Sequence, residues 1–231
     1  MEIHGFHKTT LLDYPGHVAA TVFTGGCNFR CPFCHNRNLV LHPASEPLIA
    51  EEEVFACLKK RKGILEGVCI TGGEPTLQTD LRRFIARIKE LGYPVKLDTN
   101  GYRPQTLRQL LEEGLLDYVA MDVKASLQNY KKAAGCSELD LSRIEESIDI
   151  LKNCGIACEF RTTVVKGIHT VEEFDSIGRL LSGAKIYYLQ AFRENENVLC
   201  DGFEAFPAAS MEKMADLARK YIDKVELRGV E

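Results

Sequence analysis

The 231-residue chain lacks several features that would assign it to a particular class of protein. It has no tryptophan, no apolar run near the ~18 residues that cross a bilayer, and no N-terminal stretch typical of a secretion signal. It also lacks a basic excess, since 29 Lys and Arg stand against 33 Asp and Glu, and this balance disfavours a nucleic-acid surface. We therefore expect a cytoplasmic protein that binds neither membrane nor nucleic acid directly.

A disulfide framework is also missing. The chain has nine cysteines, an odd number, and it is long enough to bury a core without covalent staples. This number of cysteines is more typical of a protein with reduced thiols and a metal or redox site than of a secreted domain cross-linked by disulfides.

No linker rich in Pro, Gly or Ser divides the sequence, and no internal repeat is visible, so one domain over residues 1–231 is predicted. Short β-branched runs alternate with segments of helical spacing, which predicts an α/β fold with parallel strands. Six runs have the length and composition of buried parallel strands: 18–23, 68–70, 95–97, 118–121, 158–165 and 186–189. Periodicity alone leaves a barrel and an open sheet as alternatives, but both place ligands at the carboxyl ends of the strands.

Three cysteines follow the first predicted strand, at Cys27, Cys31 and Cys34. Thiolates at this spacing can hold zinc or an iron–sulfur cluster from one loop. With only three protein ligands, a [4Fe–4S] cluster would keep one iron open for chemistry, whereas a structural zinc would need a fourth ligand. The other cysteines are scattered and are predicted to be ordinary buried thiols: Cys57, Cys69, Cys136, Cys154, Cys158 and Cys200.

Polar motifs also follow the later predicted strands. Gly72-Gly73-Glu74 would allow close backbone approach to a ligand beside a carboxylate, although a plain strand-to-helix turn uses the same residues. Asp98 precedes an Asn-Gly pair that is also typical of a turn. Strand alternation places the side chains of Asp122 and Lys124 on the same side of the chain. The two residues could form part of a ligand site or a surface ion pair. Arg161 lies among apolar neighbours, which predicts a buried arginine paired with a carboxylate.

Together these motifs resemble the radical S-adenosylmethionine (SAM) superfamily, whose hallmark is a Cys-x-x-x-Cys-x-aromatic-Cys loop. Cys27, Cys31, Phe33 and Cys34 match it residue for residue. The resemblance implies a [4Fe–4S] cluster on the three cysteines, SAM chelated at the open iron, and Phe33 against its adenine. It also implies that the Gly72-Gly73-Glu74-Pro75 motif contacts the amino group of SAM.

The later motifs resemble a subgroup, the glycyl-radical-enzyme activating enzymes, with their Asp-x-Lys motif, a strand Arg and a Cys-His-Asn ending. The resemblance implies that SAM is bound by residues that include Asp98, Asp122, Lys124, Arg161 and His35. Where some members have a ribose-binding His, this chain has Gln190, which can donate or accept a hydrogen bond but cannot become cationic. No catalytic side chain is assigned, because the radical would form on the cofactor.

Residues 8–16, KTTLLDYPG, resemble the opening of the longer type of anaerobic ribonucleoside-triphosphate reductase activating protein. The resemblance implies an incomplete TIM-type barrel of about six βα units, with a lead-in strand in residues 1–16, a barrel core in 17–200, and a C-terminal helix and tail in 201–231.

The implied function is reductive cleavage of SAM to a 5′-deoxyadenosyl radical, which generates a glycyl radical on a partner, the anaerobic reductase. A flavodoxin- or ferredoxin-type electron donor is expected as well. The polar loop 193–197 is a candidate for partner contact. Two alternatives stay open: a radical SAM enzyme acting on a small molecule, as in deazaguanine synthesis, and a non-catalytic zinc-binding module.

Overall fold

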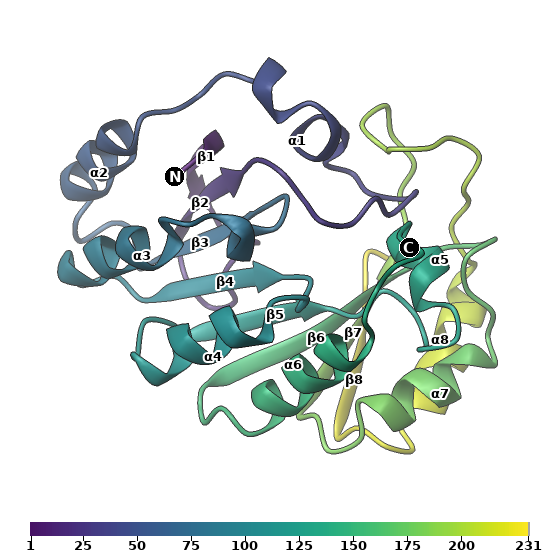
Figure 1. The fold of residues 1–231 in the computed structure, drawn as a ribbon. Helices are drawn as coiled ribbons and strands as arrows, with labels where there is room; N and C mark the ends of the chain where they lie inside the picture. Colours follow the sequence, from purple (N-terminus) through teal and green to yellow (C-terminus); the bar gives the residue numbers. More distant parts are fainter. Residues whose placement is uncertain (231) are drawn as a thin grey trace. The chain divides into compact units, whose positions relative to one another are not determined.

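The computed structural model describes residues 1–230, in which strands and helices alternate along the chain (Figure 1). The strands are hydrogen-bonded in chain order from β1 to β8. Their bounds are β1 (Ile3–Thr10), β2 (Ala19–Thr24), β3 (Gly67–Gly72), β4 (Val95–Thr99), β5 (Tyr118–Asp122), β6 (Ala157–Val164), β7 (Ile186–Ala191) and β8 (Lys224–Arg228). The helices are α1 (Arg37–Leu41), α2 (Glu51–Lys60), α3 (Leu81–Glu90), α4 (Pro104–Glu112), α5 (Tyr130–Ala134), α6 (Ser142–Lys152), α7 (Glu173–Leu180) and α8 (Ala208–Ala218), with 3₁₀ turns η1 (Pro43–Ser45) and η2 (Pro75–Leu77).

The predicted α/β fold class is confirmed. The six expected strands are β2 to β7, and the expected lead-in strand is β1, which pairs antiparallel with β2. One further strand is present, because the apolar run 225–227 of the expected tail forms β8, parallel to β7. The single-domain assignment stays a prediction.

The described chain divides into two compact units. The first comprises Met1–Asn28 and Asn38–Ala120, and the second comprises Phe29–Arg37 and the chain from Met121 onward. The division falls inside β5 and inside the cysteine loop, so that Cys27 belongs to the first unit and Cys31 and Cys34 to the second.

In the first unit the parallel strands β2, β3 and β4 are buried on both faces. β2 pairs in parallel with β3, and β3 with β4. Helix α3 packs on β4, and α2 packs on β1 (Figure 1). Helix α3 forms because its apolar residues recur at helical spacing, and all of them are buried: Leu81, Phe84, Ile85 and Ile88.

In the second unit the parallel strands β6, β7 and β8 bury one face, while most residues of the opposite face are partly exposed. Phe160 and Leu189 lie on the buried face, and α8 packs on β7 and β8. The opposite face carries polar side chains, including Arg161 and Gln190. Arg161 is largely buried and is paired with carboxylates on this face, as the sequence predicts.

None of the helices in residues 1–230 combines the length and the apolar character needed to cross a bilayer.

Candidate functional site

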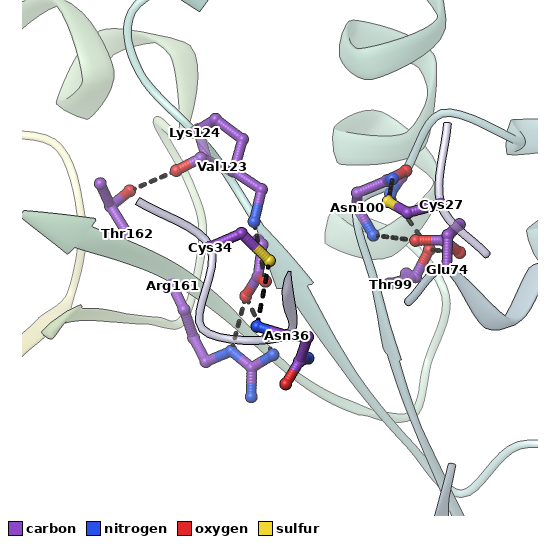
Figure 2. Close-up of polar contacts among 12 residues, drawn as sticks. Cys27, Cys34, Asn36, Glu74, Thr99, Asn100, Val123, Lys124, Arg161 and Thr162 are labelled. Carbon is purple, nitrogen blue, oxygen red and sulfur yellow. Dashed lines mark hydrogen bonds and ion pairs between the residues drawn. The ribbon is translucent and has the colours of Figure 1, made fainter. Parts of the chain in front are cut away.

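In the first unit, the candidate site centres on Glu74, directly after β3. Its side chain is buried, with the residue only 1% exposed, and both carboxylate oxygens accept hydrogen bonds (Figure 2). Oε1 accepts from the Thr76 backbone N–H at 3.1 Å, the Thr76 hydroxyl at 2.5 Å and the Thr99 hydroxyl at 2.7 Å. Oε2 accepts from the Asn100 backbone N–H at 2.6 Å. Burial raises the pKa of Glu74, and these donors oppose that shift. Glu74 thus fastens the end of β3 to the end of β4.

The glycines before Glu74 bring two backbone segments together. A Cβ on Gly73 would overlap the carbonyl oxygen of Gly26, and the N–H of Gly73 donates to the Thr24 carbonyl at 2.8 Å. The N–H of Glu74 donates to the same Gly26 carbonyl at 2.8 Å. The predicted close backbone approach is therefore present, and it fixes the residue that precedes Cys27.

Asn100 connects the end of β4 to the start of the cysteine loop. Its Nδ2 donates to Asn28 Oδ1 at 2.9 Å and lies 3.9 Å from the Cys27 sulfur (Figure 2). The sequence prediction singled out Asp98 on this strand. In the structure Asp98 forms an ion pair with Lys96, which is 2% exposed. Sequence reasoning missed Asn100 because an Asn-Gly pair after a strand indicates only a turn, and the structure has that turn as well.

In the second unit, Asp122 pairs with Lys124, which the sequence placed on the same side, and also with Arg161. Asp122 Oδ2 accepts from Lys124 Nζ at 3.0 Å, and Oδ1 accepts from Arg161 Nε at 2.9 Å (Figure 2). Burial alone would raise the pKa of Asp122, but Arg161 and Lys124 together hold it well below its usual range. Burial would lower the pKa of Lys124, yet the Asp122 carboxylate raises it above its usual range. The three groups stay ionised, with one positive charge in excess.

Two further charged residues, Glu159 and Arg228, continue the series of ion pairs that begins at Asp122, and sequence reasoning missed both. Arg161 Nη1 lies 3.8 Å from Glu159, a buried carboxylate on the same strand. Arg228 on β8 donates to both Glu159 oxygens, at 3.1 and 3.0 Å, and its guanidinium carbon lies 3.2 Å from the centre of the Tyr188 ring. Arg228 was missed because it lies in the short run assigned to the C-terminal tail.

The cysteine loop of the second unit is anchored through its backbone. The Arg30 N–H donates to the Ala134 carbonyl at 2.8 Å, and the Cys34 carbonyl accepts from the Leu199 N–H at 2.9 Å. The Asn36 N–H points at the Cys34 sulfur, 3.4 Å away (Figure 2). Burial raises the pKa of the Cys31 thiol to about 11, although Lys124 lowers it.

The remaining predicted residues of this unit lie around the loop. Phe33 is buried and packs against the ring of His169, with the ring centres 6.2 Å apart. His35 Nε2 is hydrogen-bonded to the Arg193 carbonyl at 2.6 Å, so its ring is held against the segment after β7. Gln190 lies on β7, in register with Thr163 of β6 and Arg228 of β8.

Within residues 1–230, no group of three or more Cys, His, Asp or Glu side chains is gathered closely enough to hold a single metal ion. A cluster that binds each cysteine through a different iron spaces its sulfurs more widely than the ligands of one ion. The donor set fits such a cluster, because the sulfurs are soft ligands on one eight-residue loop, 27–34, and Cys34 receives an N–H.

Comparison with known families distinguishes a radical SAM enzyme from a zinc-binding module. The sequence model of the Radical SAM superfamily matches residues 21–181, from within β2 to the end of α7. This chain belongs to the Radical SAM superfamily. Membership implies a [4Fe–4S] cluster and SAM, which agrees with the cofactors expected from the cysteine loop, and identifies the protein as a radical SAM enzyme.

Relatives of this radical SAM enzyme include a protein of Methanocaldococcus jannaschii named "Putative glycyl-radical enzyme activating enzyme MJ1227". The two are 34% identical over 235 residues, 99% of this chain and 96% of the relative. A "Probable GTP 3',8-cyclase" of Thermococcus kodakarensis is 31% identical over 67% of this chain and 50% of its own length.

Solved structures share the fold of this radical SAM enzyme. Streptococcus suis SuiB superposes with a TM-score of 0.69 at 14% identity, over 89% of this chain and 47% of SuiB. The native anSMEcpe structure with bound SAM gives a TM-score of 0.60 at 16% identity, over 85% of this chain and 57% of anSMEcpe. At these identities the likeness concerns the fold alone.

Proposed function

We propose that this radical SAM enzyme is an activating enzyme that generates a glycyl radical on a partner protein, an anaerobic ribonucleoside-triphosphate reductase. The observation that carries the proposal is the 34% identity to the Methanocaldococcus relative, which extends over 99% of this chain. The KTTLLDYPG run at residues 8–16 supports the reductase as the partner.

In this proposal Cys27, Cys31 and Cys34 hold the cluster. When bound, the cluster would supply the electron for reductive cleavage of SAM to methionine and a 5′-deoxyadenosyl radical, which would take a hydrogen atom from the glycine Cα of the partner. The protein fixes the loop from both sides: the Gly26 carbonyl accepts from the Glu74 N–H, and the Arg30 N–H donates to the Ala134 carbonyl. The Asn36 N–H would donate to the Cys34 sulfur when it holds the cluster.

Lys124, Asp122 and Arg161 would bind the methionyl end of SAM. Two cations share one carboxylate, so one positive charge remains to attract the carboxylate of a ligand. Asp122 keeps both cations in place between binding events, because it receives a hydrogen bond from each. A preordered cation pair loses little side-chain entropy when the ligand arrives.

The other predicted contacts complete the proposed SAM site. The backbone at Gly72 and Gly73 offers close approach, and Glu74 holds Thr99 and Asn100 in place; an ammonium group at Glu74 would add to the bonds that the carboxylate already accepts. Further contacts are proposed for Phe33 with the adenine, and for His35, Asp98 and Gln190 with polar groups of SAM.

The partner would contact the exposed segment 193–197. All five of its residues are exposed, and it is fixed to the cysteine loop through the Arg193 and Asn197 carbonyls, which are bonded to His35 and to the Arg37 N–H. A protein docked here would lie beside that loop. The electron donor is proposed to be a flavodoxin or ferredoxin, and the location the cytoplasm.

A small-molecule substrate is the second candidate. The GTP 3',8-cyclase relatives favour it, since the one from Saccharolobus solfataricus is 33% identical over 55% of this chain. That match covers 42% of the cyclase, whereas the activating-enzyme match covers both proteins almost fully. The family match also favours the cluster over the zinc-binding module.

Electron paramagnetic resonance tests the partner. The reconstituted protein is mixed anaerobically with SAM, a strong reductant and a purified anaerobic ribonucleotide reductase. We expect a stable glycyl radical signal on the reductase, and none when SAM is omitted. Formation of 5′-deoxyadenosine without any radical on the reductase would contradict this partner and favour the small-molecule substrate.

A further inference from the structure

Two cysteines lie together far along the chain from the cysteine loop. Helix α6 ends at Lys152 and β6 begins at Ala157, and the short connection reverses direction through Gly155, whose φ is +75°. Cys154 lies in this connection and Cys158 is the second residue of β6. Both side chains are half-buried, so each is partly accessible to solvent.

The two thiols converge on one acceptor. Cys154 Sγ lies 3.2 Å from the carbonyl oxygen of Leu151, and Cys158 Sγ lies 3.4 Å from the same oxygen. The distance between the two sulfurs therefore cannot exceed the sum of these two distances. Because the cysteines bracket one tight turn and both sulfurs approach the same oxygen, rotation of the side chains can bring the sulfurs together, as a disulfide requires.

The surrounding charges favour ionisation of one thiol. The neighbouring Cys158 thiol lowers the pKa of Cys154, and the Lys185 ammonium just before β7 adds to this effect. The proximity of Cys154 and burial raise the pKa of Cys158, as does the neighbouring Glu159 carboxylate. One sulfur of the pair is thus a better nucleophile than a free cysteine, while the other stays protonated until the first has reacted.

We propose that Cys154 and Cys158 form a redox-active dithiol site that closes reversibly to a disulfide by exchange with an oxidised thiol compound. This goes beyond the sequence prediction, which treated both residues as ordinary buried thiols. The site is independent of the proposed function. It lies at the amino end of β6, and Arg161 follows Cys158 by three residues, about 10 Å along the strand.

The exchange needs no oxidant other than the disulfide of the thiol compound. The Cys154 thiolate attacks one sulfur of a disulfide RSSR, and the S–S bond breaks to release one thiolate, RS⁻. Cys158 then loses its proton and attacks the Cys154 sulfur of the mixed disulfide, which releases a second RS⁻. The two cysteines are oxidised by two electrons, RSSR is reduced to two thiols, and a dithiol reductant reverses both steps.

One tryptic peptide makes the test direct. Cleavage after Lys152 and Arg161 yields residues 153–161, NCGIACEFR, which contains both cysteines and no others. The anaerobic holoenzyme is equilibrated in buffers from fully reduced to fully oxidised glutathione, alkylated, digested and analysed by mass spectrometry. We expect the doubly alkylated peptide to be replaced by one that carries no alkyl group and weighs two hydrogens less than the dithiol, and dithiothreitol to restore it.

Single variants locate the exchange. Cys154→Ser and Cys158→Ser each leave one thiol, so the peptide should end as a glutathione adduct and not as a disulfide. Cys57→Ser, which removes a half-buried cysteine on α2, should leave the closure of peptide 153–161 unchanged. Recovery of the doubly alkylated peptide in fully oxidised glutathione, or glutathione on both cysteines of the wild type, would overturn the proposal.

Discussion

At the scale of single residues, the carboxylates of Glu74 and Asp122 both have partners. Glu74 accepts four hydrogen bonds, and Asp122 pairs with two cations, so neither charge is left uncompensated. The two sites differ in charge. Glu74 is surrounded by neutral donors and its pKa is raised by burial, whereas the cations keep the pKa of Asp122 low.

Asp122→Asn is expected to destabilise the protein at neutral pH by roughly 1–2 kcal/mol, since two charge-assisted hydrogen bonds are weakened at a partly exposed site. The pKa of Asp122 is lower in the folded than in the unfolded chain, so its contribution is present above about pH 5 and is lost as the pH falls through the folded pKa. Urea unfolding at several pH values should therefore show the gap between variant and wild type shrinking below about pH 4.

Asp140→Asn provides the matched control, because Asp140 is an exposed carboxylate bonded to Ser142 in the same unit. It should change the unfolding free energy by less than about 0.5 kcal/mol. A constant gap between Asp122→Asn and the wild type at all pH values would contradict the assigned ion pairs.

The sequence predicted which residues lie at the ends of the strands, but not which of their side chains form hydrogen bonds and ion pairs with one another. Asp122 and Lys124 could be predicted on one side from strand alternation, and Arg161 could be predicted to be buried against a carboxylate, but not that this carboxylate is Asp122. The donors to Glu74 could not be predicted, because Thr99 and Asn100 belong to the end of another strand. Local composition does not determine the register between strands. Arg228 was missed for the same reason, since its role depends on β8 joining the sheet.

At the scale of elements, the cysteine loop of the second unit depends on the end of α5. Gly135 caps this helix in the left-handed conformation, with φ +62°, and a Cβ there would overlap the backbone carbonyl of Arg30. That carbonyl belongs to the loop between Cys27 and Cys31. Backbone atoms cannot move aside as a side chain can, so this contact fixes the path of the loop.

Gly135→Ala is therefore expected to disturb the cysteine loop, and Gly114→Ala is its matched control. Gly114 has a similar φ of +66°, but a Cβ there would have no atom within 4 Å. The control should lose about 1 kcal/mol of stability from backbone strain alone, and Gly135→Ala at least about 1–2 kcal/mol more.

Urea unfolding and the iron content of the reconstituted proteins check this expectation. Gly135→Ala should retain less iron per chain than the wild type, and Gly114→Ala should match the wild type. Equal iron content and equal stability in the two variants would show that the α5 contact does not shape the loop.

At the scale of the whole molecule, the residues proposed to bind the cofactors are divided between the two units. Cys27 and the Glu74 hydrogen bonds belong to the first unit, and Cys31, Cys34 and the Asp122 ion pairs belong to the second. The fold class could be predicted from the alternation of strands and helices, since that order follows from hydrophobic periodicity. The partner could not be predicted in this way, because partners are recognised by exposed segments, and packing in the core does not restrict the sequence of such segments.

The central claim is that the three-cysteine loop supports reductive cleavage of SAM, and the most direct measurement is 5′-deoxyadenosine formed by the anaerobically reconstituted protein with SAM and a strong reductant. The account predicts product from the wild type and from Cys200→Ala, which removes an exposed cysteine, and none from Cys34→Ala. No product from the wild type, or undiminished product from Cys34→Ala, would contradict it.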